Sequence, residues 1–194
     1  MLSLPNVTLI ALTGKGFPEH DEAIKKSCEG IEWGAVKIVY DYKIDSIDSW
    51  NKAIIYELHN YVQTDYAMLI HADGYVIRPD LWKPEFLDYD YIGAPWPLPR
   101  DNFSYLTPEG QLVRVGNSVS IRSKKIMELP SKLGLPWKAY YGYTNEDGFL
   151  CCHNKLTLEQ EGVTFAPLEL AKHFSKEHEI EENKGLSTFA FHSL

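Results

Sequence analysis

The sequence predicts a single α/β domain over residues 1–194, built on a parallel sheet with helices on its faces. Three observations support this fold class. The chain has 194 residues, which is the usual size of one domain. Its first half alternates short apolar runs with helical patterns, as parallel sheets require. The leading apolar run has no polar face, which is typical of a strand covered by helices on both sides.

The first half contains three predicted strands and two predicted helices. The strands are the runs 7–12, 35–40 and 66–70. A helix over residues 20–29 ends before Gly30, which suits a C-terminal cap. Ser46 is a suitable N-cap for the second helix. The apolar positions of that helix recur every three or four residues: Ile47, Trp50, Ile54, Leu58 and Tyr61.

The second half is less regular. Prolines recur between residues 79 and 110 and predict loops and short strands there. A strand over 113–121 is interrupted at Gly116-Asn117, and Asn145 precedes a short helix. The highly charged stretch 176–184 predicts a solvated surface or a mobile loop. The remaining predicted elements are a helix over 124–128 and strands over 163–166 and 187–191.

Composition and charge restrict the functions to consider. The net charge of -8 disfavours nucleic acid as a partner, because the phosphate backbone attracts basic proteins. An acidic protein that handles phosphate needs a local device, such as a metal ion or a helix N-terminus. The three cysteines form no metal-ligand spacing and fit a reducing compartment. With no visible targeting or membrane segment, the sequence predicts a cytoplasmic protein.

The strongest local signal is His71-Ala72-Asp73-Gly74 at the end of a predicted strand. Residues two apart in a strand face the same side, so His71 and Asp73 are expected to face one ligand. Thr13-Gly14 ends a neighbouring strand, and ligands of such sheets bind at the carboxyl ends of strands. The competing interpretation of Asp73-Gly74 is a simple turn.

His192 lies close to the C-terminus in an aromatic tail. Taken alone it is a surface or hydrogen-bonded histidine. Paired with Asp73 it would complete an oxygen and nitrogen site for Mn²⁺ or Mg²⁺, because carboxylates suit these ions and imidazole favours Mn²⁺.

Two further segments carry candidate residues. Glu146 and Asp147 follow Asn145, where a helix dipole stabilises anions, and one of them is a candidate general base. Gly116-Asn117 inside a strand indicates either a bulge or a close approach of the backbone to a ligand.

Several ordered segments resemble one family. The most specific is Asp88 to Trp96, which reads Asp-Tyr-Asp-Tyr-Ile-Gly-Ala-Pro-Trp. The others include Ser46 to Asn51, Val115-Gly116-Asn117, Glu146-Asp147, Phe174-Ser175-x-Glu177 and Phe191-His192. Through these segments the chain resembles the DUF5672 family, whose members look like GT-A glycosyltransferases. The resemblance implies one GT-A-like domain with a mixed, mostly parallel central sheet flanked by helices.

The resemblance also implies a function. It predicts a metal-dependent transferase that moves a sugar from a nucleotide-diphosphate donor to a glycan or lipid-linked acceptor. It implies Asp73 and His192 as ligands of Mn²⁺ or Mg²⁺, with His71 beside them, and Asp147, or else Glu146, as the base of an inverting reaction. The acceptor would stack on Tyr91 and Trp96. The implied donor-binding residues are Thr13, Gly14, Ser49, Asn51, His71, Gly116 and Asn117.

Two other functions remain open from the sequence. A metal-dependent phosphoesterase would use the same Asp and His residues and would hydrolyse its substrate without an acceptor. A non-catalytic glycan-binding module would bind no nucleotide through a metal. The sequence also leaves room for a membrane-associated partner enzyme, because little chain follows His192 to bind an acceptor.

Overall fold

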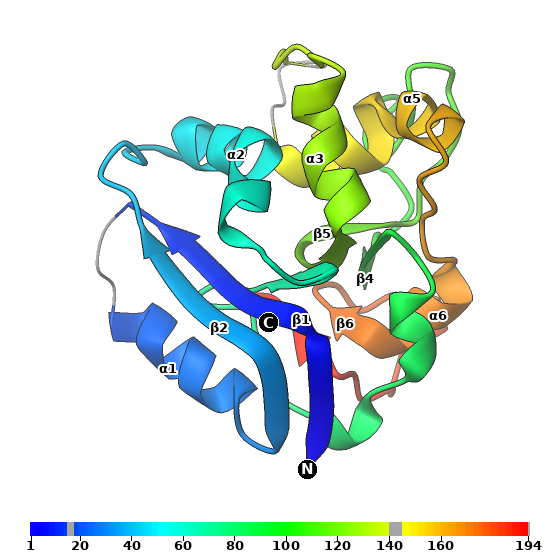
Figure 1. The fold of residues 1–194 in the computed structure, drawn as a ribbon. Coiled ribbons are helices and arrows are strands. Elements are labelled where there is room, and N and C mark those ends of the chain that lie inside the picture. Colours follow the sequence, from blue (N-terminus) through cyan, green and yellow to red (C-terminus); the bar gives the residue numbers. More distant parts are fainter. Residues whose placement is uncertain (15–17, 140–144, 194) are drawn as a thin grey trace.

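The computed structural model describes residues 1–14, 18–139 and 145–193. Its centre is one five-stranded sheet in the order β2-β1-β3-β5-β4 (Figure 1). β1 pairs in parallel with β2 and β3, whereas β5 pairs antiparallel with β3 and β4. Four of the five strands run in one direction and β5 runs in the other, so the sheet is mixed and mostly parallel, as expected. The strands are β1 (Leu2–Thr13), β2 (Ile31–Tyr40), β3 (Tyr66–Leu69), β4 (Tyr91–Pro95) and β5 (Val115–Ser123).

Helices cover both faces of this sheet (Figure 1). On one face, α2 (Ile47–Tyr56) and α3 (Lys124–Lys132) pack over Ile10, Leu12 and Leu69. On the other face, α1 (Pro18–Ser27) and α6 (Leu168–Phe174) pack over alternate residues of the same strands, including Leu9, Ala11 and Met68. Strand side chains alternate between faces, so a strand covered on both sides is apolar throughout.

The remaining helical segments surround the end of the sheet formed by β4 and β5. The short α4 (Glu146–Gly148) continues into a π-helical turn (Phe149–His153) and then α5 (Lys155–Gln160). Buried residues of these segments form a third apolar cluster with the sheet and α2: Ile55, Tyr91, Trp96, Ile126, Phe149 and Leu158.

Both helices predicted for the first half are present, but α1 spans Pro18–Ser27 instead of residues 20–29. The Ser46 side chain accepts a hydrogen bond from Ser49 N, and Ser49 Oγ accepts one from Ser46 N, so α2 begins with a capping box. Gly30 follows α1 with a φ of 76°, which favours glycine. α2 is shorter than the apolar pattern predicts, because a separate 3-10 turn (Leu58–Tyr61) follows it.

Several predictions for the second half are wrong in extent. Residues 163–166 form only an isolated bridge between Phe165 and Tyr91, not a strand. The predicted strand over 187–191 is reduced to β7 (Ala190–Phe191), which pairs with β6 (Ser175–Lys176). The helix predicted over 124–128 extends to Lys132 as α3.

The charged stretch 176–184 is not simply a solvated surface. Ile180 and Asn183 are buried in it, and Asn183 donates a hydrogen bond to the His178 carbonyl oxygen. A short 3-10 helix (Glu181–Asn183) lies within it. This segment is therefore anchored to the body of the protein.

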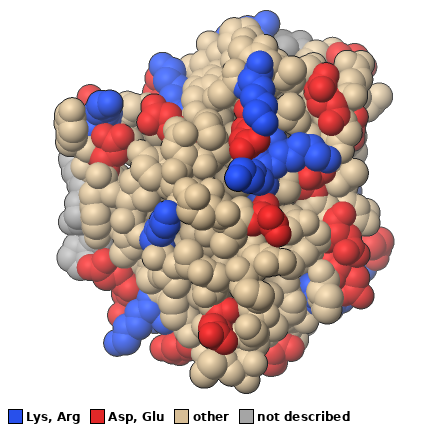
Figure 2. Space-filling view, viewed as in Figure 1, with Lys and Arg blue, Asp and Glu red and all other residues tan. Residues whose placement is uncertain are grey.

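Charges of both signs mix on the surface. Figure 2 shows basic side chains gathered over α3, with acidic side chains around them. All three cysteines are free. Within the described ranges, none of the helices combines the length and apolarity needed to cross a membrane.

Candidate functional site

A cavity lies at the carboxyl ends of β1 and β3, as predicted for this kind of sheet. The chain passes from β1 to β2 on one side and later to β3 on the other, and ligands bind where the strand order switches in this way. The volume of this strand-end cavity is about 510 Å³. Its lining includes Thr13, Gly14, His20, Trp50, His71, Asp73 and His192.

The C-terminal segment delivers His192 to this cavity. β7 lies between β6 and the residues that follow β3. Phe191 N donates to the Tyr75 carbonyl oxygen at 3.2 Å, and His192 N donates to the Lys176 carbonyl oxygen at 3.0 Å. Ser193 N closes the arrangement by donating to the Asp73 carbonyl oxygen at 2.8 Å. Hydrogen bonds on both sides thus fix the backbone that carries His192.

The lack of a side chain at Gly74 lets His192 and Val119 lie close to the backbone there. A Cβ atom at this position would lie 2.6 Å from His192 Cδ2 and 2.6 Å from Val119 Cγ2. Real Cβ atoms do not come this close to other atoms. Any other residue at position 74 would therefore require His192, Val119 or the backbone to shift.

Asp73 and His192 face each other, and His71 lies beside them. His192 Nε2 is 3.7 Å from Asp73 Oδ1. The His71 ring stacks on the His192 ring with centroids 5.0 Å apart, and it lies 5.1 Å from the Trp50 ring. Burial and the neighbouring charges of His192 and Arg122 lower the pKa of His71. His71 Nε2 has no hydrogen-bond partner among the described residues.

Glu177 and Asn117 hold His192 from its other side. Glu177 Oε1 lies 3.5 Å from His192 Nδ1, and Asn117 Nδ2 lies 3.2 Å from the same nitrogen. Burial alone would lower the pKa of His192, but the hydrogen bond and charge of Glu177, with the charge of Asp73, outweigh burial and raise it. Asn117 Oδ1 accepts from Val119 N at 2.9 Å, which fixes the orientation of the amide.

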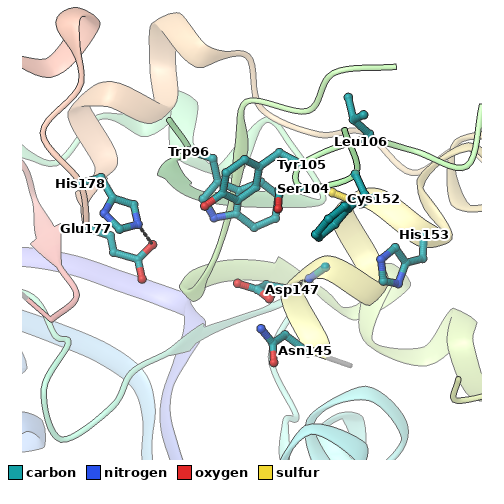
Figure 3. Close-up of a pocket in the computed structure, with 12 residues that line it drawn as sticks. Trp96, Ser104, Tyr105, Leu106, Asn145, Asp147, Cys152, His153, Glu177 and His178 are labelled. Carbon is teal, nitrogen blue, oxygen red and sulfur yellow. Dashed lines mark hydrogen bonds and ion pairs between the residues drawn. The ribbon is translucent and has the colours of Figure 1, made fainter. Parts of the chain in front are cut away.

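A second cavity adjoins this ion pair on the opposite side of His192. Its volume is about 380 Å³, and we call it the aromatic cavity. It is formed by three segments far apart in the sequence: residues 96–106, 145–153 and 177–178. Trp96 and Tyr105 form one wall, with ring centroids 4.9 Å apart, and Asp147 points toward them (Figure 3).

Asp147 lines the aromatic cavity with a pKa well above the usual value of an aspartate. Burial and the charge of Glu146 raise the pKa of Asp147 to about 7. Glu177 adds to this effect, whereas the Gly148 N–H, which donates to Asp147 Oδ1 at 2.7 Å, and the charge of Arg122 oppose it. A carboxylate poised near neutral pH is suited to accept a proton.

Glu146 does not share this position. Its side chain is fully buried, and its Oε2 atom lies 2.7 Å from Arg122 Nη2, which is buried as well. The backbone N–H of Glu146 donates to Asn51 Oδ1 at 3.0 Å. Glu146 therefore joins the helical segment to β5 and α2, and the structure favours Asp147 as the candidate base.

Four other predicted positions differ from expectation. The Tyr91 ring is fully buried and its hydroxyl donates to the Asn117 carbonyl oxygen, so it cannot stack on a ligand. Gly116 serves packing, because a Cβ atom there would lie 2.0 Å from the Trp96 ring. Ser49 acts in the capping box, and Asn51 accepts from Glu146 N. Neither of these two lines the strand-end cavity, whereas Ser46, Ile47 and Trp50 do.

The sequence reasoning missed three residues that line the cavities. Tyr105 lies in a stretch where prolines predicted only loops. His20 has no recognisable spacing to other histidines. Glu177 falls in the run predicted as solvated surface, and the only signal for it is its place in the family-like segment Phe174-Ser175-x-Glu177.

Comparison with known proteins gives a family. A family model with the description "Protein of unknown function (DUF5672)" matches residues 35–192. Neither the curated proteins nor the solved structures include a significant match to the chain. The matched region contains β3, the Asp147 segment and His192, and it covers most of the chain, so this protein belongs to the DUF5672 family.

Proposed function

We propose that this protein is a GT-A-type, metal-dependent glycosyltransferase that moves a sugar from a nucleotide-diphosphate donor to a glycan or lipid-linked acceptor. One observation carries the proposal. The strand-end cavity, with Asp73 and His192, meets the aromatic cavity, with Asp147, across the ion pair between His192 and Glu177. A transferase needs two such adjoining sites, one for each substrate.

The strand-end cavity offers two side chains of the kind that bind a divalent cation together with the phosphates of a substrate, whereas the described residues contain no group of three or more His, Cys, Asp and Glu side chains that would hold the ion by themselves. Asp73 offers a carboxylate and His192 an imidazole nitrogen, and the unpartnered Nε2 of His71 lies in the same cluster. Mg²⁺ and similar ions are often held by one or two carboxylates together with substrate phosphates. Bound Mn²⁺ or Mg²⁺ would neutralise charge on the leaving diphosphate. Trp50 and Ile47 supply an apolar wall for the nucleotide.

Asp147 acts on the acceptor in this proposal. Its carboxylate takes the proton from an acceptor hydroxyl while that oxygen forms the new bond to the anomeric carbon. The bond from that carbon to the nucleoside diphosphate breaks, and the diphosphate leaves with the electron pair. A base on the face opposite the leaving group gives inversion of the anomeric centre. A pKa of about 7 for Asp147 fits this role.

A thermal-shift experiment tests the donor site. The melting temperature of the protein is measured with UDP, GDP, dTDP and CMP, each with and without Mn²⁺. A ligand that binds only the folded state raises the melting temperature by mass action. We expect one nucleotide to stabilise the protein only with Mn²⁺, and expect Asp73→Asn and His192→Ala to abolish that stabilisation. Asp65→Asn, an exposed carboxylate outside both cavities, is the matched control.

The same experiment, combined with an assay of phosphate release without an acceptor, separates the alternatives. Mn²⁺-dependent nucleotide binding with release of phosphate and no need for an acceptor would favour the phosphoesterase. The absence of any Mn²⁺-dependent nucleotide shift would contradict the transferase proposal and favour the glycan-binding module.

A further inference from the structure

We propose that the acceptor is a neutral oligosaccharide of at least two sugar units, and that Tyr105 is the platform on which it binds. This inference rests on the proposed function and specifies the substrate class of its second site. It is drawn from three independent features of the described residues: a cavity that extends the aromatic cavity, a strained backbone at Tyr105, and the charges along the walls.

The aromatic cavity continues into another cavity. This outer cavity has a volume of about 440 Å³ and shares Ser104, Tyr105 and His178 with the aromatic cavity. Each cavity alone is within the usual size of a small-molecule pocket. Together they form an acceptor groove that runs from Asp147 past Tyr105 to Arg100. A groove of this extent exceeds what a single sugar ring fills.

Tyr105 lies where the two cavities meet, and its backbone is strained. Its φ of 56° is in the left-handed region, which is unusual for a bulky side chain. Such strain is energetically costly and clusters at ligand sites. Val113 N donates to the Tyr105 carbonyl oxygen at 2.7 Å and holds this conformation. This hydrogen bond keeps the backbone in the strained conformation, in which the Tyr105 ring lines both cavities.

The loop before Tyr105 is held by hydrogen bonds to the Asp101 side chain. Asp101 Oδ1 accepts from Phe103 N at 2.9 Å and from Ser104 N at 2.6 Å, and Asp101 Oδ2 accepts from Ser104 Oγ at 2.7 Å. Trp96 supports the Tyr105 ring from behind. A platform that is already ordered loses little entropy on binding, which favours affinity.

The inner end of the groove is acidic, whereas Arg100 lines the outer cavity together with Asp101 and Glu179. Asp147 and Glu177 place two carboxylates at the inner end, and no lysine or arginine is among the described residues that line the aromatic cavity. Carboxylates accept hydrogen bonds from sugar hydroxyls and repel phosphate, sulfate or carboxylate groups. Aromatic rings provide a flat apolar face for a sugar ring. The reacting end of the acceptor is therefore an uncharged sugar.

Direct binding of oligosaccharides tests the inference without nucleotide or metal. Labelled glucose-, galactose-, mannose- and N-acetylglucosamine-type sugars of one to six units are titrated into the full-length protein, beside matched chains containing uronic acid or phosphate. We expect one neutral series to bind, with affinity rising from the monosaccharide to the di- or trisaccharide and then levelling off. Tyr105→Ala is expected to weaken binding about tenfold, and Tyr105→Phe to retain it.

Controls separate this result from a failure of the fold or of the donor site. Tyr42→Ala removes a tyrosine that is 87% exposed and lines neither cavity, so it should bind oligosaccharide like the wild type. The Mn²⁺-dependent nucleotide shift should persist in Tyr105→Ala. If that shift is absent from the wild type but the neutral series binds, the groove inference holds and the transferase proposal fails.

Three results would overturn the inference while leaving donor binding intact. They are equal affinity for monosaccharides and longer chains, equal or tighter binding of the acidic series, and unchanged binding by Tyr105→Ala. Failure of every neutral series to bind would also overturn it.

Discussion

At the scale of single residues, the acid pair Glu146 and Asp147 shows how the environment separates two neighbours of similar chemistry. Glu146 is buried against Arg122, and its charge is compensated there. Asp147 faces the aromatic cavity with no such partner, so burial and the charge of Glu146 raise its pKa to about 7. Two adjacent carboxylates thereby differ in their surroundings: one joins elements, and the other has the acidity that the proposed proton transfer requires.

The first prediction concerns the pH dependence of stability at Asp147. An unfolded aspartate titrates near about 3.9, and the native pKa is about 7, so folding favours the protonated form. That contribution to stability is fully present below about pH 4 and is lost as the pH rises through about 7. Asp147→Asn cannot ionise. Its melting temperature relative to the wild type should therefore rise by several degrees between pH 4 and pH 8.

Differential scanning fluorimetry at pH 4, 6 and 8 measures this difference, with Asp65→Asn as the control for an exposed carboxylate. A melting-temperature difference for Asp147→Asn that stays constant over this range would contradict the prediction.

In the same variant the proposed transfer reaction should be lost. In the wild type the kcat/KM of that reaction should rise as the pH rises through about 7.

At the scale of elements, the placement of His192 depends on the small size of Gly74. The short pairing of β6 and β7 brings the C-terminal segment across Gly74. A substitution at position 74 tests whether nucleotide binding depends on the geometry of the Asp73 and His192 pair, because a methyl group there changes no charge.

Gly74→Ala is the second prediction. Its Cβ would overlap His192 and Val119, so we expect lower stability and loss of the Mn²⁺-dependent nucleotide shift. Gly110→Ala is the control: nothing lies within 4 Å of its Cβ, and its φ of 82° costs on the order of 1–2 kcal/mol. The melting temperatures of both variants, measured with and without nucleotide and Mn²⁺, test this prediction. An intact nucleotide shift in Gly74→Ala would show that the position of His192 is not critical.

Most elements of the first half were predictable because local patterns determine them. β1, β2 and β3 were found as apolar runs, and Ser46 as a cap, since strand burial and capping depend on neighbours in sequence. The 176–184 stretch was not predictable in this way. Its charged composition indicates solvent, whereas Asn183 is buried through hydrogen bonds to its own loop. Burial that depends on hydrogen bonds within a loop produces no hydrophobic pattern in the sequence.

At the scale of the whole molecule, the two cavities differ in how far the sequence foretold them. The strand-end cavity follows from the order of parallel strands, so Thr13, Gly14, His71 and Asp73 were predicted at one edge and lie there. The aromatic cavity forms where three segments that are far apart in the sequence come together, and a local sequence pattern does not predict such a contact. The aromatic residue at the junction is consequently Tyr105, whereas the predicted Tyr91 is buried in the core.

The ion pair between Arg122 and Glu146 joins these parts of the molecule. Arg122 belongs to β5 in the central sheet, and Glu146 begins the helical segment that carries Asp147. The two side chains are 1% and 0% exposed. A charge buried at this depth is costly without its partner, whereas replacing both partners by apolar residues is often neutral.

The third prediction follows from this asymmetry. Glu146→Leu should leave the Arg122 charge without its counterion and reduce the free energy of unfolding by about 3–5 kcal/mol, and Arg122→Met should reduce it similarly. The double variant Arg122→Met with Glu146→Leu should be more stable than either single variant. Urea unfolding followed by tryptophan fluorescence measures all three. If the losses of the single variants simply add in the double variant, the two charges do not compensate each other. Retention of the nucleotide shift and of the proposed transfer activity in the double variant would exclude Glu146 from the proposed chemistry and leave Asp147 as the candidate base.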